Sequence, residues 1–333
     1  MSTGSFSIDR TRIDYNKRHS RTRHVSAESL SHPESFQKGD RIMKLAHVAA
    51  ATVLMGASLG AVAGDFFELN KAFPFRLSGA NNQNTDRYFL DATGRTITSS
   101  FTVTTEIGDV LIPLVASSIS YNSIATSGPI PRTVTGSGVL TLLDYRLTED
   151  VQLAGQAIGD MYDFVYRDSR DNKLVFGTRV ILGLPGQQQN AELNNVFRYG
   201  FEENGTVFDA AAAWMYMSDF DLRLYSAARS DQGLGSTDVY DPDAISFQSD
   251  INLSEDNPYS GLYLIKTNAT YYTVADSAIG YFQAGEEGQP IVKAFIGGFV
   301  PTNTAPIPEP STYAMLLAGL GMIGVIARRR MRA

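Results

Sequence analysis

The stretch DFVYRDSRDNKLVFGTRVIL, residues 163–182, holds two apolar runs on either side of a short polar segment. The runs, 163–167 and 173–182, are rich in the β-branched and aromatic residues that favour strands. The segment between them, 168–172, contains the Asp, Ser and Asn that favour tight turns. We therefore predict an antiparallel β-hairpin here.

Short segments of the same kind recur along residues 64–300. They lie at 96–104, 139–147, 261–266, 270–274, 278–282 and 291–296. Many short strands separated by turns predict a mainly all-β domain, an antiparallel β-sandwich or jelly-roll-like fold. One short helix is expected at 209–217, where Asp209 can act as a cap and four alanines follow. Trp214, in this segment, is expected to anchor the core.

Cysteine and histidine are missing from this expected domain. The 333-residue chain has no Cys, and its four histidines all precede residue 48, at His19, His24, His32 and His47. Disulfides, most zinc sites, the Ser-His-Asp triad and the Cys-His dyad are therefore excluded from 64–300. We expect no enzyme activity and no cofactor.

Charge is distributed unevenly along the chain. Residues 64–300 hold 29 acidic and 15 basic side chains, a net charge of 15 − 29 = −14. Residues 1–42 hold eight basic and five acidic side chains, and the last six residues hold four arginines. An acidic body repels phosphate backbones, so we expect no nucleic-acid partner and a solvated extracellular surface.

The segment 43–63 has the three parts of a secretory signal peptide. It begins with Met43 and Lys44, continues as a short apolar run of small residues, and ends in Ala61-Val62-Ala63. Signal peptidase is expected to cut after Ala63, with Ala61 and Ala63 in its two small pockets; a buried core helix is the alternative. The polar segment 1–42 is predicted to be a disordered extension or a mis-assigned start before Met43.

A second apolar segment lies at the C-terminus. Pro308-Glu309-Pro310 closes an expected linker, 301–310, and is followed by 17 uncharged residues, 311–327. As a helix these would extend about 26 Å, at the short end of what crosses a ~30 Å bilayer core. Arg328, Arg329 and Arg330 would stop transfer and keep the tail 328–333 in the cytoplasm.

The order of these elements resembles the PEP-CTERM sorting signal: Pro-Glu-Pro, a short polar stretch, a Gly-containing apolar helix and terminal arginines. The resemblance covers residues 306–333. It implies recognition by exosortase, cleavage near Pro308-Glu309-Pro310, and delivery to the cell surface or the exopolysaccharide-rich biofilm matrix of a Gram-negative bacterium. The inner membrane would be a transient partner. An ordinary single-pass anchor is the alternative reading.

Carboxylates suggest two weaker kinds of site. Asp238, Asp241 and Asp243 could gather oxygens around calcium, although the run lacks EF-hand spacing. A second such set is Asp160, Asp163, Asp168 and Asp171. A pair of carboxylates could also hydrolyse glycosides without His or Cys; the candidates are Glu192, Glu202 and Glu203.

Aromatic and amide side chains suggest a polysaccharide-binding module as the main alternative to a structural or adhesive body. Tyr rings could stack on sugars, with amides beside them. The candidates are Tyr259, Tyr263, Tyr271, Tyr272 and the 187–190 loop. Tyr is also common in strands, so the pattern does not decide between the two readings.

Overall fold

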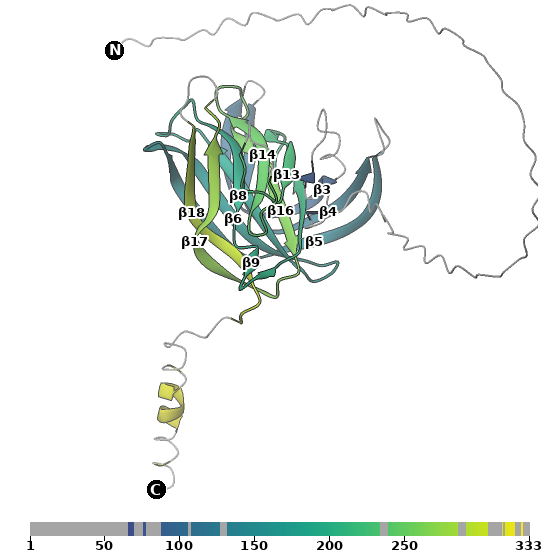
Figure 1. Cartoon of the computed structure of the whole chain (residues 1–333), viewed down its shortest axis with the longest axis vertical. Coiled ribbons are helices and arrows are strands. Elements are labelled where there is room, and N and C mark those ends of the chain that lie inside the picture. Colours follow the sequence, from purple (N-terminus) through teal and green to yellow (C-terminus); the bar gives the residue numbers. More distant parts are fainter. Residues whose placement is uncertain are drawn as a thin grey trace, which may run out of the picture. The chain divides into compact units, whose positions relative to one another are not determined.

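A computed structural model describes residues 66–69, 76–77, 88–105, 108–126, 132–233, 239–285, 291–305, 315, 317–323 and 328. Figure 1 shows that the regular structure between residues 66 and 305 consists of strands, several of them long and curved. The prediction of a mainly antiparallel β domain is confirmed.

The larger sheet has ten strands. Eight follow one path, in the order β1 (Phe67–Glu68), β11 (Ala210–Met215), β16 (Leu262–Thr267), β7 (Leu174–Leu182), β6 (Gln156–Asp168), β5 (Arg132–Leu153), β4 (Gly108–Thr126) and β3 (Leu90–Thr105). Neighbours on this path are antiparallel. Beside it, β12 (Asp221–Leu222) pairs in parallel with β15 (Tyr259–Ser260), which also contacts β7.

The smaller sheet has six antiparallel strands. Their order is β18 (Val292–Thr302), β17 (Tyr271–Gln283), β8 (Glu192–Arg198), β14 (Ile245–Asn252), β13 (Ser226–Ala228) and β2 (Arg76–Leu77). A separate small hairpin joins β9 (Glu202–Glu203) to β10 (Thr206–Val207). The last strand runs to Thr302, two residues past the expected end of the domain at 300.

The predicted hairpin at 163–182 is confirmed as β6 and β7, whose pairing ends at Arg167 and Leu174. Asn172 has a positive φ of 58°, and its N–H donates to the Asp168 carbonyl oxygen at 2.9 Å. Asn tolerates this left-handed conformation better than most residues, which explains the tight turn.

The predicted helix at 209–217 is wrong, because this segment forms the strand β11. Ala212 pairs with Phe67 of β1 on one side and with Ile265 of β16 on the other. Helix propensity differs among ordinary residues by less than about 1 kcal/mol each, so burial and pairing on both edges override the preference of alanine. The short helix of the described residues lies instead at 317–323.

The larger sheet curls so that strands far apart in its order meet. β3 ends the order and β11 is second from the opposite end, yet Phe89, beside β3, bridges to Trp214. Their ring centres are 4.9 Å apart, and Arg95 donates to the Tyr216 carbonyl oxygen at 2.5 Å. Trp214 is 2% exposed within the main core, which confirms its predicted role as a core residue.

A second core joins the two sheets. It contains Val180 of β7 from the larger sheet, with Leu193 of β8 and Ile279 of β17 from the smaller one. All three are fully buried. The two sheets therefore form two packed layers, with apolar side chains from both between them.

Candidate functional site

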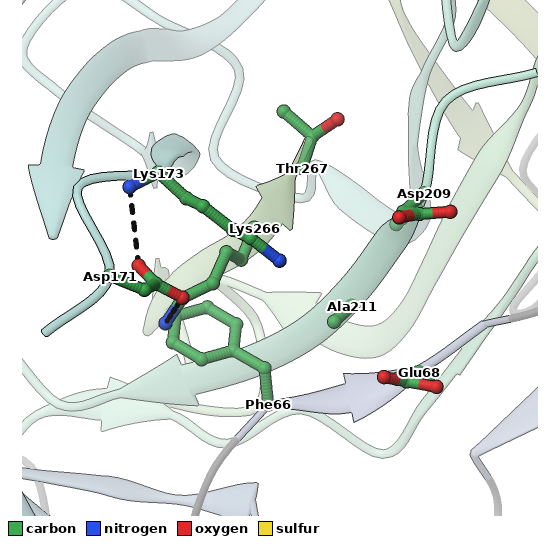
Figure 2. A pocket seen from close by; sticks show the side chains of 9 residues that line it. Phe66, Glu68, Asp171, Lys173, Asp209, Ala211, Lys266 and Thr267 are labelled. Carbon is green, nitrogen blue, oxygen red and sulfur yellow. Dashed lines mark hydrogen bonds and ion pairs between the residues drawn. The ribbon is translucent and has the colours of Figure 1, made fainter. Parts of the chain in front are cut away.

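A pocket of about 270 Å³ opens where four distant parts of the chain meet: β1, the β6–β7 turn, the start of β11 and the end of β16 (Figure 2). Its lining residues are Phe66, Glu68, Asp171, Lys173, Asp209, Ala210, Ala211, Lys266 and Thr267. The volume is just below the ~300–1,000 Å³ typical of small-molecule pockets.

Lys266 is the most constrained side chain of the pocket. Its Nζ lies 2.6 Å from Asp168 Oδ2 and 3.2 Å from Asp171 Oδ2. The same ammonium lies 4.4 Å from the centre of the Phe66 ring. Because two carboxylates and one ring surround this charge, Lys266 connects Phe66, the residue before β1, to the β6–β7 turn.

Asp168 anchors this cluster from the interior. Its carboxylate is fully buried and accepts hydrogen bonds from the Tyr121 hydroxyl at 2.8 Å and the Arg170 N–H at 3.0 Å. Burial, and then the Asp168 charge, raise the pKa of Tyr121 far above its usual value. Tyr121 is therefore a neutral donor at any ordinary pH, and the cluster is a structural network.

The remaining wall of the pocket carries exposed charges. Figure 2 shows Glu68 and Asp209 on the side opposite Asp171. Lys173 lies beside Asp171 and donates its backbone N–H to the Asp171 carboxylate at 3.2 Å. Carboxylates on one side and lysines on the other give the pocket groups that accept and donate hydrogen bonds to a polar ligand.

The calcium candidates Asp241 and Asp243 hold the backbone of a loop. Asp241 accepts the Asp243 N–H at 2.8 Å, and Asp243 accepts the N–H groups of Gly200 and Glu202 at 3.0 and 3.1 Å. Asp238 lies outside the described residues. Within the described part of the chain, no group of three or more His, Asp or Glu side chains could hold a metal ion.

The second acidic set is dispersed along the β6–β7 hairpin. Asp160 accepts the Asp150 N–H and the Gln187 amide at 3.0 and 3.1 Å, whereas Asp163 pairs with Arg198. Gln187, a candidate from the 187–190 loop, is thereby occupied in holding that loop to β6. Asp168 and Asp171 share Lys266, whereas Asp160 and Asp163 each serve other partners, so the four carboxylates do not converge on one site.

The glycosidase candidates occupy different environments. Glu192 is buried and accepts the Asn194 amide at 2.5 Å. Glu203, next to Glu202 in β9, accepts hydrogen bonds from Thr302 Oγ1 at 2.6 Å and the Asn303 N–H at 3.0 Å. These bonds, led by that of Thr302, lower the pKa of Glu203. A general acid for glycoside hydrolysis needs the opposite shift.

The tyrosine candidates do not form one aromatic platform. Tyr263 is buried, and half-buried Tyr259 packs edge-on against Phe101 with ring centres 5.7 Å apart. Tyr271 is exposed, whereas Tyr272 packs against Phe299 at 5.5 Å. Tyr271, 38% exposed, is therefore the most accessible of these four rings.

Three fully buried arginines, Arg179, Arg198 and Arg229, were not anticipated from the sequence, and the first two form buried ion pairs. Arg198 pairs with Asp163 at 2.5 Å and also donates to the Phe299 carbonyl oxygen at 2.6 Å. Arg179 pairs with Asp221 at 2.5 Å. The available signal was an arginine inside each of two apolar strands, in FGTRVIL and in NVFRYG. A charge at such a position is buried only when it is paired.

The predicted targeting residues lie almost wholly outside the described residues: Ala61, Ala63, Pro308, Glu309, Pro310, Arg329 and Arg330. Arg328 alone is described. The predicted membrane segment 311–327 is described at Met315 and at 317–323, and the side chains there are mostly exposed. Across the described residues, no helix has the length and apolar character needed to span a membrane.

Comparison with known proteins identifies the C-terminal tail. Residues 306–330 match the family model for the PEP-CTERM protein-sorting motif. Searches of curated proteins and of solved structures found no match to the chain. The motif implies export across the membrane to the cell surface and processing by exosortase. Residues 306–330 of this chain are therefore a PEP-CTERM protein-sorting motif.

Proposed function

We propose that this protein is a non-enzymatic component of the cell surface or extracellular matrix of a Gram-negative bacterium. Its two-layered, sandwich-type body is structural or adhesive, and its tail directs it there. The observation that carries the proposal is the sorting motif at 306–330. A sorting motif of this kind directs a protein to the cell surface. The acidic body, with a net charge of −14 over residues 64–300, is compatible with a solvated extracellular surface.

The start of the folded body supports removal of the signal peptide after Ala63. Phe66 already lines the pocket, and β1 begins at Phe67. Leu69 is fully buried, and its carbonyl oxygen accepts a hydrogen bond from Arg229 at 3.4 Å. Cleavage by signal peptidase after Ala63 would therefore leave every described strand in the mature chain.

The tail supplies the second processing step of the proposal. The apolar segment 311–327 holds the protein transiently in the inner membrane, with Arg328, Arg329 and Arg330 on the cytoplasmic side. The two prolines of Pro308-Glu309-Pro310 disfavour helix by their chemistry, which would leave the motif accessible to exosortase. Cleavage there releases the body to the outside.

The test replaces Pro308, Glu309 and Pro310 with alanine in the full chain. We expect the variant to accumulate uncut in the inner membrane, while the control Glu255→Ala, at an exposed position of the body, is released like the wild type. Fractionation followed by immunoblotting measures both. Release of the triple variant in processed form would refute exosortase sorting.

Polysaccharide binding is the second candidate function, favoured by the mixed-charge pocket around Lys173 and Asp209. Saccharide hydroxyls both donate and accept hydrogen bonds, which this lining can satisfy. Binding of the purified protein to host exopolysaccharide should be lost in Lys173→Ala and in Asp209→Ala but kept in the exposed control Glu255→Ala. Absence of wild-type binding would remove this candidate and leave the sorting proposal intact.

A further inference from the structure

One half of the long strand β5 has a strand neighbour on only one side within the described part of the chain. The pairing of β4 with β5 ends at Ser118 and Thr141, whereas the pairing of β6 with β5 continues to Leu153. The rest of β4 pairs with β3. Residues 142–150 therefore present a sheet edge, and such an edge is a template for another strand.

This edge carries large apolar side chains. Leu143, Tyr145 and Leu147 are 41%, 49% and 40% exposed. Elsewhere in β5, Leu140, Val151 and Leu153 are buried, whereas Val134, which pairs with Ile124 of β4, is 54% exposed. Leu143, Tyr145 and Leu147 differ from Val134 in lying on the segment that β4 leaves uncovered. Three such side chains on a free edge are unusual for a soluble surface and mark an interaction site.

Opposite charges alternate with these apolar residues. Asp144 precedes Tyr145 and Arg146 follows it, and both charged side chains are exposed. The Asp144 carboxylate accepts the Tyr145 N–H at 2.8 Å, and the Arg146 guanidinium lies 6.0 Å from the Phe299 ring of β18. In the sequence Leu-Asp-Tyr-Arg-Leu, a leucine therefore lies two residues from Tyr145 on each side. The residues directly beside Tyr145 carry opposite charges, Asp144 before it and Arg146 after it.

We propose that this edge pairs with the same edge of a second copy of the chain, antiparallel and with the two-fold axis at Tyr145. Residues directly opposite across an antiparallel pair share a face and interact. Leu143 then faces Leu147 of the other copy, Tyr145 faces itself, and Asp144 faces Arg146. Both copies make the same contacts, as a two-fold interface requires.

The charges select this register over its neighbours. Moving the axis to Arg146 places the two Arg146 side chains opposite each other, and moving it to Asp144 places two carboxylates together. Like charges directly opposite are destabilising. The axis at Tyr145 is the register in which both charged pairs attract and the large apolar residues face one another.

The expected dimer is weak. One strand pair buries less surface than the ~1,200–2,000 Å² of stable interfaces, so a transient interface that gains from high local concentration is expected. The proposal concerns the described body alone and stands or falls independently of the sorting tail.

The absence of cysteine from the chain allows a direct test. Tyr145→Cys in the full chain, kept in mild detergent, places two thiols opposite each other at the axis. We expect an oxidation-dependent dimer on non-reducing gels for Tyr145→Cys and little for the control Thr102→Cys, on the outer strand β3. Equal cross-linking of the two variants, or none, would overturn the proposal.

A charge exchange provides the second test and does not depend on a cysteine. Arg146→Asp and Asp144→Arg, each made in the Tyr145→Cys chain, should lower the cross-linking rate at least about tenfold, because each places like charges together twice. The double exchange, Asp144→Arg with Arg146→Asp, should restore it. Loss without restoration, with circular dichroism unchanged, would contradict the register.

Discussion

The tail of this chain is defined by a contiguous sequence motif, whereas the body is defined by contacts between residues that are distant in sequence. The tail is identified by 25 consecutive residues, 306–330. The body is held by contacts between residues far apart in sequence: Asp163 with Arg198, Asp168 with Lys266, and Arg179 with Asp221. A local sequence pattern can be recognised without a structure, whereas a buried network of contacts between distant residues cannot. The destination of the protein was therefore easier to infer than its architecture.

Among the predicted changes, removing the Arg198 side chain should lower the free energy of unfolding of the body the most. The pair with Asp163 is buried, at 0% and 3% exposure of the two side chains, and it joins the two sheets. Arg198→Ala leaves an unpaired buried carboxylate, and we expect the free energy of unfolding to fall by about 3–5 kcal/mol. Urea denaturation followed by circular dichroism measures this change.

A double variant makes that test more specific. Asp163→Leu with Arg198→Met removes both charges, so it should be less destabilised than Arg198→Ala alone. Equal or greater destabilisation of the double variant would show that the side-chain shape at this position, and not the unpaired charge, dominates.

A smaller effect is expected at the interior end of the pocket cluster. Tyr121→Phe removes the hydroxyl that donates to fully buried Asp168 at 2.8 Å. The lost hydrogen bond should lower the unfolding free energy by about 1–3 kcal/mol. The control Tyr271→Phe, on an exposed ring, should leave thermal stability unchanged. An unchanged unfolding free energy in Tyr121→Phe would show that the Tyr121 hydroxyl does not contribute to the stability of the network.

The smallest effect is expected where the body ends. Glu203 accepts hydrogen bonds from Thr302, Asn303 and Thr304, which lower its pKa in the folded state. A carboxyl group with a lowered folded pKa stabilises the fold above its unfolded pKa and loses that contribution as the pH falls through the folded pKa. Relative to Glu203→Gln, the wild type should be more stable at neutral pH.

The same comparison at low pH completes this prediction. As the pH falls below the unfolded Glu pKa of ~4.3 and on through the lowered folded pKa of Glu203, the advantage of the wild type over Glu203→Gln should shrink. Thermal melts of both chains across this range measure the difference. An advantage that stays constant or grows on acidification would contradict the role given to Glu203.

The strands that sequence reasoning identified are those with strong local signals. The hairpin at 163–182 has apolar runs on both sides of an Asp-Ser-Arg-Asp-Asn turn, and it folds as predicted. The segment 210–215 misled because alanine favours helix locally, whereas its two strand partners, β1 and β16, come from residues 67–68 and 262–267. The sequence around 210–215 contains no information about these two distant partner strands.

The pocket could not be predicted for the same reason. Phe66, Asp171, Asp209 and Lys266 span 200 residues of sequence and meet only after both sheets have formed. The calcium candidates Asp238, Asp241 and Asp243, by contrast, lie close together in the sequence, and the glycosidase candidates rest on residue type alone. In the structure Asp243 and Glu203 use their oxygens to hold nearby backbone, which is the more common use of carboxylates at turns and strand ends.

The mass of the C-terminus of the protein recovered from outside the cell tests the central claim most directly. We predict a chain that has lost the apolar segment 311–327 and the arginines at 328–330, with a new C-terminus near Pro308-Glu309-Pro310. Peptide mapping by mass spectrometry locates that end. An extracellular protein that keeps Arg328, Arg329 and Arg330 would contradict sorting by exosortase.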